Sequence, residues 1–333
     1  MRVTVGIETT KAPEAEDVVP RRPPRRRRQI PWGWRKATPY LLLIPAVVLE
    51  LLIHIVPMAI GVWISFIRLT QEYIQHWSSA PTAGFDNYRI ALKFSGPVGR
   101  SLLHSFEITC MYTLLVVSCS WGIGLVAAWV LQRPFMGRGP VRTLFLVPYA
   151  LPIFAGVIIW NFMLQRDSGV VNQLLVNDLH LLNHKPFWLI GNNAFFSTAV
   201  VAIWRQWPFA FLMIMAGMQS IPEDVYEASA IDGAGSWSQF FRITLPMLRP
   251  VNTVLLLMLF LWTFNDFNTP FVLYSMSVPP STDLMSIHIY TNSFQVWNFG
   301  YGSAMSVLML LFLLLVTAIY LPIANRRSRS VVL

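Results

Sequence analysis

Long runs of hydrophobic residues, separated by short polar stretches, dominate the chain. A helix needs about 20 apolar residues to cross about 30 Å of hydrocarbon. In lipid the backbone must pair its own polar groups, so such runs are predicted as helices rather than open strands. Six runs are long enough, and the predicted spans are residues 40–67, 105–131, 141–164, 194–218, 251–274 and 301–324. The pattern therefore predicts an all-α polytopic membrane protein with six transmembrane helices.

Composition supports a membrane setting. Hydrophobic residues make up 55% of the 333 residues and charged residues only 12%, whereas soluble domains carry about 25% charged residues. Cys110 and Cys119 lie within one apolar run and lack the spacing of a zinc site, so we expect two buried thiols and no bound metal or disulfide framework.

Positive charge gathers at the N-terminus. The formal net charge is +9, and ten of the 25 Lys and Arg residues precede Thr38. Residues 1–38 are also rich in proline, so we expect a disordered cytoplasmic tail near anionic lipid rather than a nucleic-acid-binding element. The first apolar run is too long for a secretory signal and shows no clear cleavage site.

The distribution of basic residues also predicts orientation. With the N-terminus inside, the inner segments hold eighteen Lys and Arg residues and the outer segments hold six. The positive-inside rule therefore predicts that both termini are cytoplasmic. The membrane-spanning core would cover residues 39–325, followed by a short basic cytoplasmic tail, residues 326–333.

One long inner connection, residues 219–250, carries ordered helix signals. Ser220 precedes Glu223 by three positions, and Ser236 precedes Gln239 by three, which are two capping-box patterns. We predict short helices at about 221–231 and 236–244. Gly233 is predicted to end the first helix in a left-handed conformation. The pair Leu245-Pro246 is predicted to end the second.

This connection resembles the "EAA" loop of ABC importer permeases. The family pattern is Glu-Ala-Ala, three residues, Gly, nine residues, then an apolar residue and Leu-Pro. The matching residues here are Glu227, Ala228, Gly233, Leu245 and Pro246. Ser229 stands where the family has its second alanine. The fuller sequence is similar to permeases of the maltose, trehalose and glycerol-phosphate type, and the resemblance covers about residues 40–324.

The resemblance implies a type I importer permease fold whose loop forms coupling helices on a cytoplasmic ATPase. The residues that it assigns to ATPase coupling, either in the contact or in shaping the loop, are Glu227, Ala228, Ser229, Asp232, Gly233, Ala234, Leu245 and Pro246. An ordinary solvated helix charge is the alternative for Glu227. No P-loop pattern Gly-x4-Gly-Lys-Ser/Thr occurs in the chain. ATP and Mg²⁺ are therefore expected on a separate subunit, with no cofactor on this chain.

Charge within a membrane span is costly, and a functional role is the default hypothesis for such a residue. The candidates in the predicted spans are Glu50, His54, Glu107, Arg205 and Asp266. In the fifth span, Trp262, Asn265, Asp266 and Asn268 combine aromatic faces with hydrogen-bonding groups, which suits a sugar. Packing within the fold is the alternative for this cluster.

Two further groups of span residues allow more than one interpretation. Trp204 and Arg205 precede Pro208 in the fourth span, so they are predicted either to line a cavity or, through an Arg205–Asp266 ion pair, to stabilise the fold. Glu50 and His54 lie four residues apart, as in a proton relay or an intrahelical pair at a subunit interface. Glu107 lies near the outer end of the second span and is expected to affect membrane topology or helix packing rather than transport.

The sequence thus predicts a transport subunit rather than an enzyme, in a bacterial plasma membrane. By the resemblance, its partners are a second permease, two ATPase subunits and an extracytoplasmic solute-binding protein, either free or lipid-anchored. The implied solute is a sugar or a related polyol or glycerol phosphodiester. A non-sugar ABC permease and a proton-coupled secondary transporter remain the alternatives.

Overall fold

The computed structural model describes residues 32–132 and 135–329, and these are helical apart from short connections and two isolated β-bridges. Within these residues, five helices are long and apolar enough to cross a membrane, or six when one sharply bent pair counts as a single span. The predicted all-α membrane class is therefore confirmed. The chain divides into two compact units, residues 1–57 and 58–333.

The first unit carries helix α1 (Trp32–Glu50) and a π-helical turn, η1 (Leu51–Ile55), and helix α2 (Val56–Ile64) begins at its end. The candidate span Pro39–Ile64 ends three residues before the predicted limit. His54 Nδ1 lies 3.2 Å from Glu50 Oε2, so the predicted intrahelical contact forms. The predicted tail, residues 1–38, lies outside the described residues except where α1 begins.

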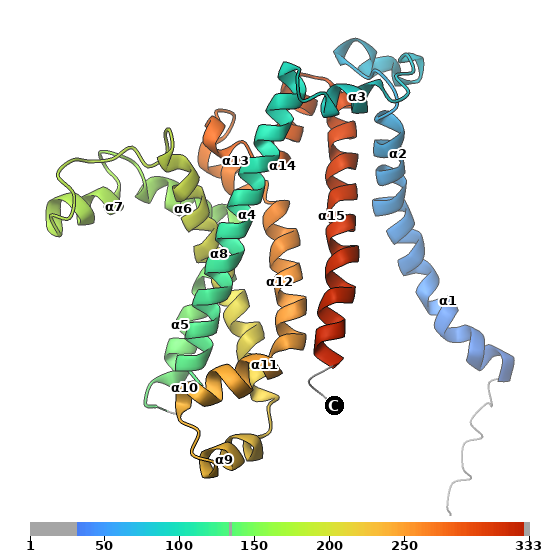
Figure 1. The fold of residues 1–333 in the computed structure, drawn as a ribbon. Helices are drawn as coiled ribbons and strands as arrows, with labels where there is room; N and C mark the ends of the chain where they lie inside the picture. Colours follow the sequence, from blue (N-terminus) through green and yellow to red (C-terminus); the bar gives the residue numbers. More distant parts are fainter. Residues whose placement is uncertain (1–31, 133–134, 330–333) are drawn as a thin grey trace, which may run out of the picture. The chain divides into compact units, whose positions relative to one another are not determined.

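Four long helices form the core of the second unit: α4 (Pro97–Val130), α8 (Asn193–Gln219), α12 (Arg249–Phe264) and α15 (Phe299–Arg329). Figure 1 shows that the axes of these helices are roughly aligned. The largest apolar cluster is shared by α4, α8 and α12 and includes the fully buried Phe211, Ile214, Leu255 and Leu259. Helix α15 packs in a second cluster with residues of α4 and α12. The core therefore forms between helices, as in a membrane bundle.

Helices α4 and α8 approach closely at Gly124. A Cβ atom at this position would lie 2.7 Å from the Ala210 Cβ and 2.7 Å from the Phe211 backbone nitrogen. Small residues at helix crossings let backbones approach and gain van der Waals contact in lipid. Gly124 therefore sets the distance between the two central helices.

Replacing Gly124 with leucine is expected to destabilise the bundle by about 1–3 kcal/mol or more, the usual cost of overpacking. A thermal melt of the purified chain in detergent checks this. Gly122→Leu is the matched control, since a Cβ at Gly122 meets nothing within 4 Å. Equal melting temperatures for the two variants would contradict the proposed role of the crossing.

The predicted third span, residues 141–164, is not one continuous helix. It consists of α5 (Arg138–Ala150) and α6 (Ile153–Met163), which meet at 93°. Leu151 is extended, with φ −72° and ψ 142°, the conformation that a following proline favours. Pro152 thus breaks the helix, an effect that hydrophobic run length does not reveal.

The predicted fifth span, residues 251–274, is also interrupted. Helix α12 ends at Phe264 and helix α13 (Asn268–Tyr274) follows after three non-helical residues. The Asp266 carboxylate accepts a hydrogen bond from the Thr269 N–H at 3.1 Å and so satisfies one donor of the first turn of α13. Asp266 therefore lies at a break rather than along a straight helix.

The remaining predicted spans agree with α4, α8 and α15 within a few residues at most boundaries, although α4 begins eight residues earlier.

The connections carry short helices: η2 (Gln71–Ser79), α3 (Asp86–Leu92), α7 (Val170–Asn172), η3 (Gln173–Asp178), η5 (Pro280–Thr282), α14 (Met285–Tyr290) and η6 (Thr291–Gln295). Figure 1 places α3 at the opposite end of the second unit from the loop 219–250.

Candidate functional site: a two-helix loop and a polar cavity

The loop 219–250 contains a short helix, α9 (Glu223–Ile231), that ends at a glycine corner. Gly233 has φ +81°, as predicted. The Gly233 N–H donates to the Ala230 carbonyl at 3.0 Å, and the Ala234 N–H donates to the Ser229 carbonyl at 2.9 Å. These two bonds form a Schellman motif, which closes the helix and turns the chain.

The predicted capping box at Ser220 does not form. The N-cap of α9 is Pro222, which makes no side-chain cap. The Ser220 hydroxyl instead donates backwards to the Gly217 carbonyl at 2.7 Å. In the second predicted box, the amide nitrogen of Gln239 donates to residues of α9.

The second helix of the loop is longer than predicted. It comprises α10 (Ser236–Gln239), a π-helical turn η4 (Phe240–Thr244) and α11 (Leu245–Met247). A proline ring in a regular helix clashes with the carbonyl four residues before it. The π turn ahead of Pro246 pairs the Leu245 N–H with the Phe240 carbonyl and lets the helix pass the proline. The prediction that Leu245-Pro246 ends the helix was wrong.

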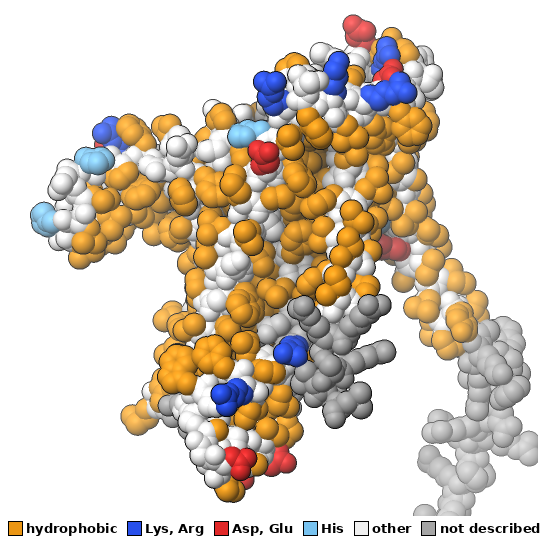
Figure 2. Space-filling model, viewed as in Figure 1, with side chains coloured by type: hydrophobic (Ala, Val, Ile, Leu, Met, Phe, Trp, Pro, Cys, Tyr) orange, Lys and Arg blue, Asp and Glu red, His pale blue; other side chains and the backbone are white. Residues whose placement is uncertain are grey.

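Six of the eight predicted coupling residues lie on α9 or at its glycine corner, at the tip of the loop, whereas Leu245 and Pro246 lie on α11. Glu227, Ala228, Asp232 and Gly233 are exposed, whereas Ser229, Ala234, Leu245 and Pro246 are half-buried. Glu223, Asp224 and Glu227 lie on α9 and Asp232 follows it, with no basic residue in the helix. Figure 2 shows acidic side chains at the tip of this loop, next to apolar ones.

Sequence reasoning missed some of the apolar surface. The side chain of Ile231 is 88% exposed at the end of α9, and Trp237 is also exposed. Phe240 is buried against Trp129 of α4, with ring centroids 5.2 Å apart. The loop is therefore anchored to the bundle through Phe240 and presents a mixed acidic and apolar tip.

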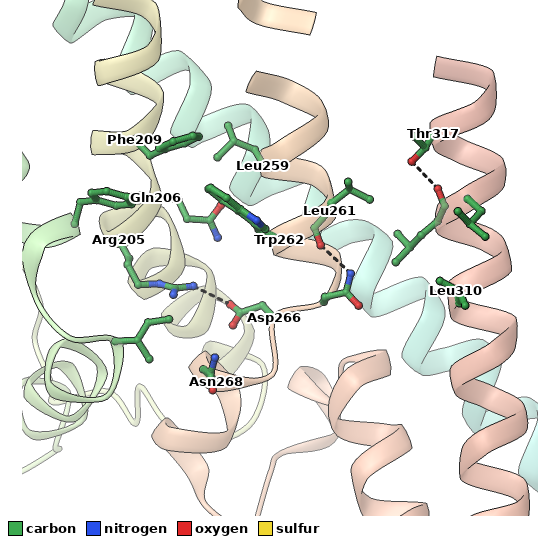
Figure 3. Close-up of a pocket in the computed structure, with 15 residues that line it drawn as sticks. Arg205, Gln206, Phe209, Leu259, Leu261, Trp262, Asp266, Asn268, Leu310 and Thr317 are labelled. Atoms are coloured by element: carbon green, nitrogen blue, oxygen red, sulfur yellow. Dashed lines mark hydrogen bonds and ion pairs between the residues drawn. The ribbon is translucent and has the colours of Figure 1, made fainter. Parts of the chain in front are cut away.

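A cavity of about 700 Å³ opens between helices α5, α6, α8, α12 and α15. Its lining includes five of the six predicted pathway residues: Arg205, Trp262, Asn265, Asp266 and Asn268. Figure 3 shows Arg205 and Asp266 pointing toward one another, with Phe209 and Trp262 nearby. The rest of the lining is largely apolar, with Tyr149, Gln206 and Thr317 adding polar groups.

Asp266 forms the centre of a buried network. Its side chain is 2% exposed, and Arg205 Nη2 lies 3.7 Å from Asp266 Oδ2. The Tyr112 hydroxyl on α4 donates to the same oxygen at 2.8 Å. The predicted Arg205–Asp266 pair is confirmed. The contribution of Tyr112 was not predicted, because a tyrosine within an apolar run gives no distinctive signal.

The other candidates lie elsewhere. Trp204 does not line the cavity; its ring packs edge-on against Trp160 of α6, with centroids 5.8 Å apart. Residues 204 and 205 point in different directions, as neighbours on a helix must. Glu107 is exposed on α4. The described residues contain no group of three or more His, Cys, Asp or Glu side chains that could hold a metal ion.

Residues 120–329 match the family described as the binding-protein-dependent transport system inner membrane component. The chain is 35% identical over 291 residues to the sulfoquinovosyl glycerol transport system permease protein SmoG of Agrobacterium fabrum, covering 86% of this chain and 90% of that protein. It is 30% identical to the trehalose/maltose transport system permease protein MalF of Thermococcus litoralis, covering 86% and 94%.

The fold also matches a solved structure, a bacterial ABC transporter involved in the import of the acidic polysaccharide alginate. The TM-score is 0.74 at 20% identity, covering 88% of this chain and 97% of that one. The matched family segment contains the whole two-helix loop, α8, α12 and α15. The chain therefore belongs to the family of binding-protein-dependent transport system inner membrane components, and it is a multi-pass inner-membrane permease of an ABC importer rather than an enzyme.

Proposed function

We propose that this chain forms half of the translocation pathway of a sugar importer and binds its ATPase through the tip of the two-helix loop. The observation that carries the ATPase contact is the acidic, exposed helix α9, fixed by the Schellman motif at Gly233. ATP and Mg²⁺ belong to the ATPase in this proposal. Glu227, Ala228, Asp232, Gly233 and Ala234 form the contact, while Ser229, Leu245 and Pro246 support it.

The partners follow from the family. A second permease completes the pathway, two ATPase subunits bind the loops of the two permeases, and an extracytoplasmic binding protein delivers the solute. ATP draws the ATPases together and moves both loops, and the pathway alternates between its two openings. We infer that both termini are cytoplasmic: six spans, counting the bent pair α5–α6 as one, put the termini on the same side, and the excess of Lys and Arg in the inner segments favours the cytoplasm.

A sugar suits both the relatives and the cavity. Two relatives are named for sulfoquinovosyl glycerol and for trehalose and maltose. Trp262 and Phe209 lie with ring centroids 4.9 Å apart and offer apolar faces, while Asn265 and Asn268 offer amides. Sugars present apolar ring faces and a rim of hydroxyl groups, so this lining matches their chemistry, and 700 Å³ is within the usual range for small-molecule sites.

Proton coupling was the alternative for the contact between Glu50 and His54, and the energy source is tested directly. Proteoliposomes that contain the four kinds of subunit separate ATP-driven import from proton coupling. ATP-driven uptake that persists after the proton gradient is collapsed supports the importer. Uptake that needs the gradient and not ATP would support proton coupling.

The acidic tip is tested by Glu227→Lys. The change reverses one charge on a helix with no basic residue, so we expect the affinity of the permease pair for the ATPase to fall about tenfold, within the range of interfacial charge pairs. Binding of purified ATPase to the permeases in nanodiscs measures it. Glu72→Lys is the matched control, since Glu72 is an exposed acid in η2, in the connection before α3. Equal affinities would contradict the contact.

A further inference from the structure

Helix α9 has no buried residue, although it is the element proposed to receive force from the ATPase. It is joined to the rest of the loop by Pro222 on one side and by the sequence Gly233-Ala234-Gly235 on the other. Hydrophobic burial within this chain therefore does not fix the position of α9. Its connection to the second helix must depend largely on polar contacts.

Two sets of side-chain hydrogen bonds provide that connection. The Gln239 amide nitrogen donates to the Ser229 hydroxyl at 2.9 Å and to the Tyr226 carbonyl at 3.2 Å. The Ser229 hydroxyl in turn donates to the Tyr226 carbonyl at 2.8 Å. Separately, the Tyr226 and Thr244 hydroxyl groups lie 3.0 Å apart. Each set joins α9 to the helix that runs from Ser236 to Met247.

Ser229 is also the position at which the sequence departs from the Glu-Ala-Ala pattern. An alanine there has no side-chain acceptor for the Gln239 amide. The serine hydroxyl is half-buried and takes part in two hydrogen bonds, one as donor and one as acceptor. The substitution therefore adds a contact between the two helices rather than being a neutral change of similar size.

The far side of the second helix is fastened to the bundle. Phe240 directly follows Gln239, is buried, and packs against Trp129 of α4. Trp237, two residues before Gln239, also lies against Trp129, with ring centroids 5.0 Å apart. A displacement of α9 would therefore pass through Gln239 to a segment that cannot move without α4.

We infer that Gln239 is a positioning residue for energy coupling, and that its contact with Ser229 and Tyr226 makes the two loop helices move as one body. This inference rests on the proposed contact between the tip and the ATPase. Without the contact, α9 would pivot at Pro222 and at Gly233-Ala234-Gly235. ATP would then be hydrolysed without an equal movement of α4.

The experiment compares solute taken up per ATP hydrolysed by the complete transporter in proteoliposomes. Gln239→Leu is expected to lower this ratio about threefold to tenfold, the range that loss of a neutral hydrogen bond gives, while the ATPase stays bound. Gln239→Glu keeps the shape but removes both donors when ionised, so it loses the bond to the Tyr226 carbonyl and should also lower the ratio. Its effect should be smaller than that of Gln239→Leu, because the Ser229 hydroxyl can turn to donate to the carboxylate. Ser229→Ala should have a smaller effect, because the Tyr226 carbonyl remains as an acceptor. The double variant Ser229→Ala with Gln239→Leu should be no worse than Gln239→Leu.

Gln219→Leu is the matched control, since Gln219 is an exposed glutamine at the start of the same loop. Three results overturn the inference: an unchanged uptake ratio in Gln239→Leu, normal coupling in Gln239→Glu, or loss of ATPase binding in step with loss of uptake. The last would make the contact a determinant of docking alone. Failure of the unaltered permease to bind the ATPase would instead refute the proposed function.

Discussion

Replacing Gly233 with valine is expected to lower ATP-dependent uptake by roughly tenfold or more. Gly233 has φ +81°, which a β-branched residue adopts only at a cost of about 1–3 kcal/mol. The valine variant would lose the Schellman bonds from Gly233 and Ala234, so α9 would end differently and its acidic tip would be misplaced. Uptake into proteoliposomes and retention of the ATPase on the purified permease pair measure the effect.

Gly235→Val is the matched control for this change. Gly235 lies two residues away, has φ −72° and ψ 166°, and a Cβ there meets nothing within 4 Å. Valine favours extended backbone, so the control should keep most of its uptake. If both variants transport normally, the corner does not position the contact. If both fail equally, added bulk rather than backbone conformation is responsible.

Gly233 also illustrates what could be predicted from the sequence. Only glycine commonly takes the left-handed conformation at the end of a helix, so a Gly after a short helical run was an adequate signal. The capping box at Ser220 gave a similar signal but did not form, because the Ser220 hydroxyl donates to the Gly217 carbonyl, and the amide nitrogen of Gln239 donates to Ser229 of α9. A capping pattern shows that a suitable donor and acceptor are present, but the tertiary structure determines which hydrogen bonds they form.

The breaks in two spans show a further limit. Hydrophobic length identified residues 141–164 and 251–274 as spans, but not the bend at Pro152 or the interruption around Asp266. Prolines in membrane helices are often tolerated, as Pro208 within α8 shows. Whether a proline breaks a helix depends on neighbours that can satisfy the freed carbonyl groups, and these come from distant parts of the chain.

The cavity was predictable in composition but not in geometry. Charge within a span singled out Arg205 and Asp266, and the two residues are paired. Tyr112 and the lining residues of α5, α6 and α15 carry no signal, because a tyrosine or leucine in an apolar run is ordinary. The prediction for Trp204 was wrong because Trp204 is next to Arg205 in the sequence and was expected to face the same cavity. Adjacent residues on a helix point in different directions.

Asp266→Ala is expected to cause the largest loss of stability of any single change in the cavity. It removes the counter-charge of Arg205 and the acceptor of the Tyr112 hydroxyl and the Thr269 N–H. Breaking one partner of a buried ion pair costs about 3–5 kcal/mol, because the other charge stays buried without compensation. Unfolding of the purified chain in detergent, monitored by its helical signal against a denaturant, measures the change.

A second variant separates fold from transport. Arg205→Met together with Asp266→Asn removes both charges but keeps similar volumes and an acceptor for Thr269. Since replacing both partners of a buried pair is often close to neutral, this double variant should recover most of the lost stability. If the pair only holds the fold, uptake should recover with it. If the two side chains also contact the sugar, the double variant should be stable and still transport poorly, with a raised half-saturating concentration of the loaded binding protein or a lowered maximal rate. Full recovery of both stability and uptake would assign the pair to the fold alone and would leave the aromatic and uncharged polar lining, including Trp262, Asn265 and Asn268, to contact the sugar.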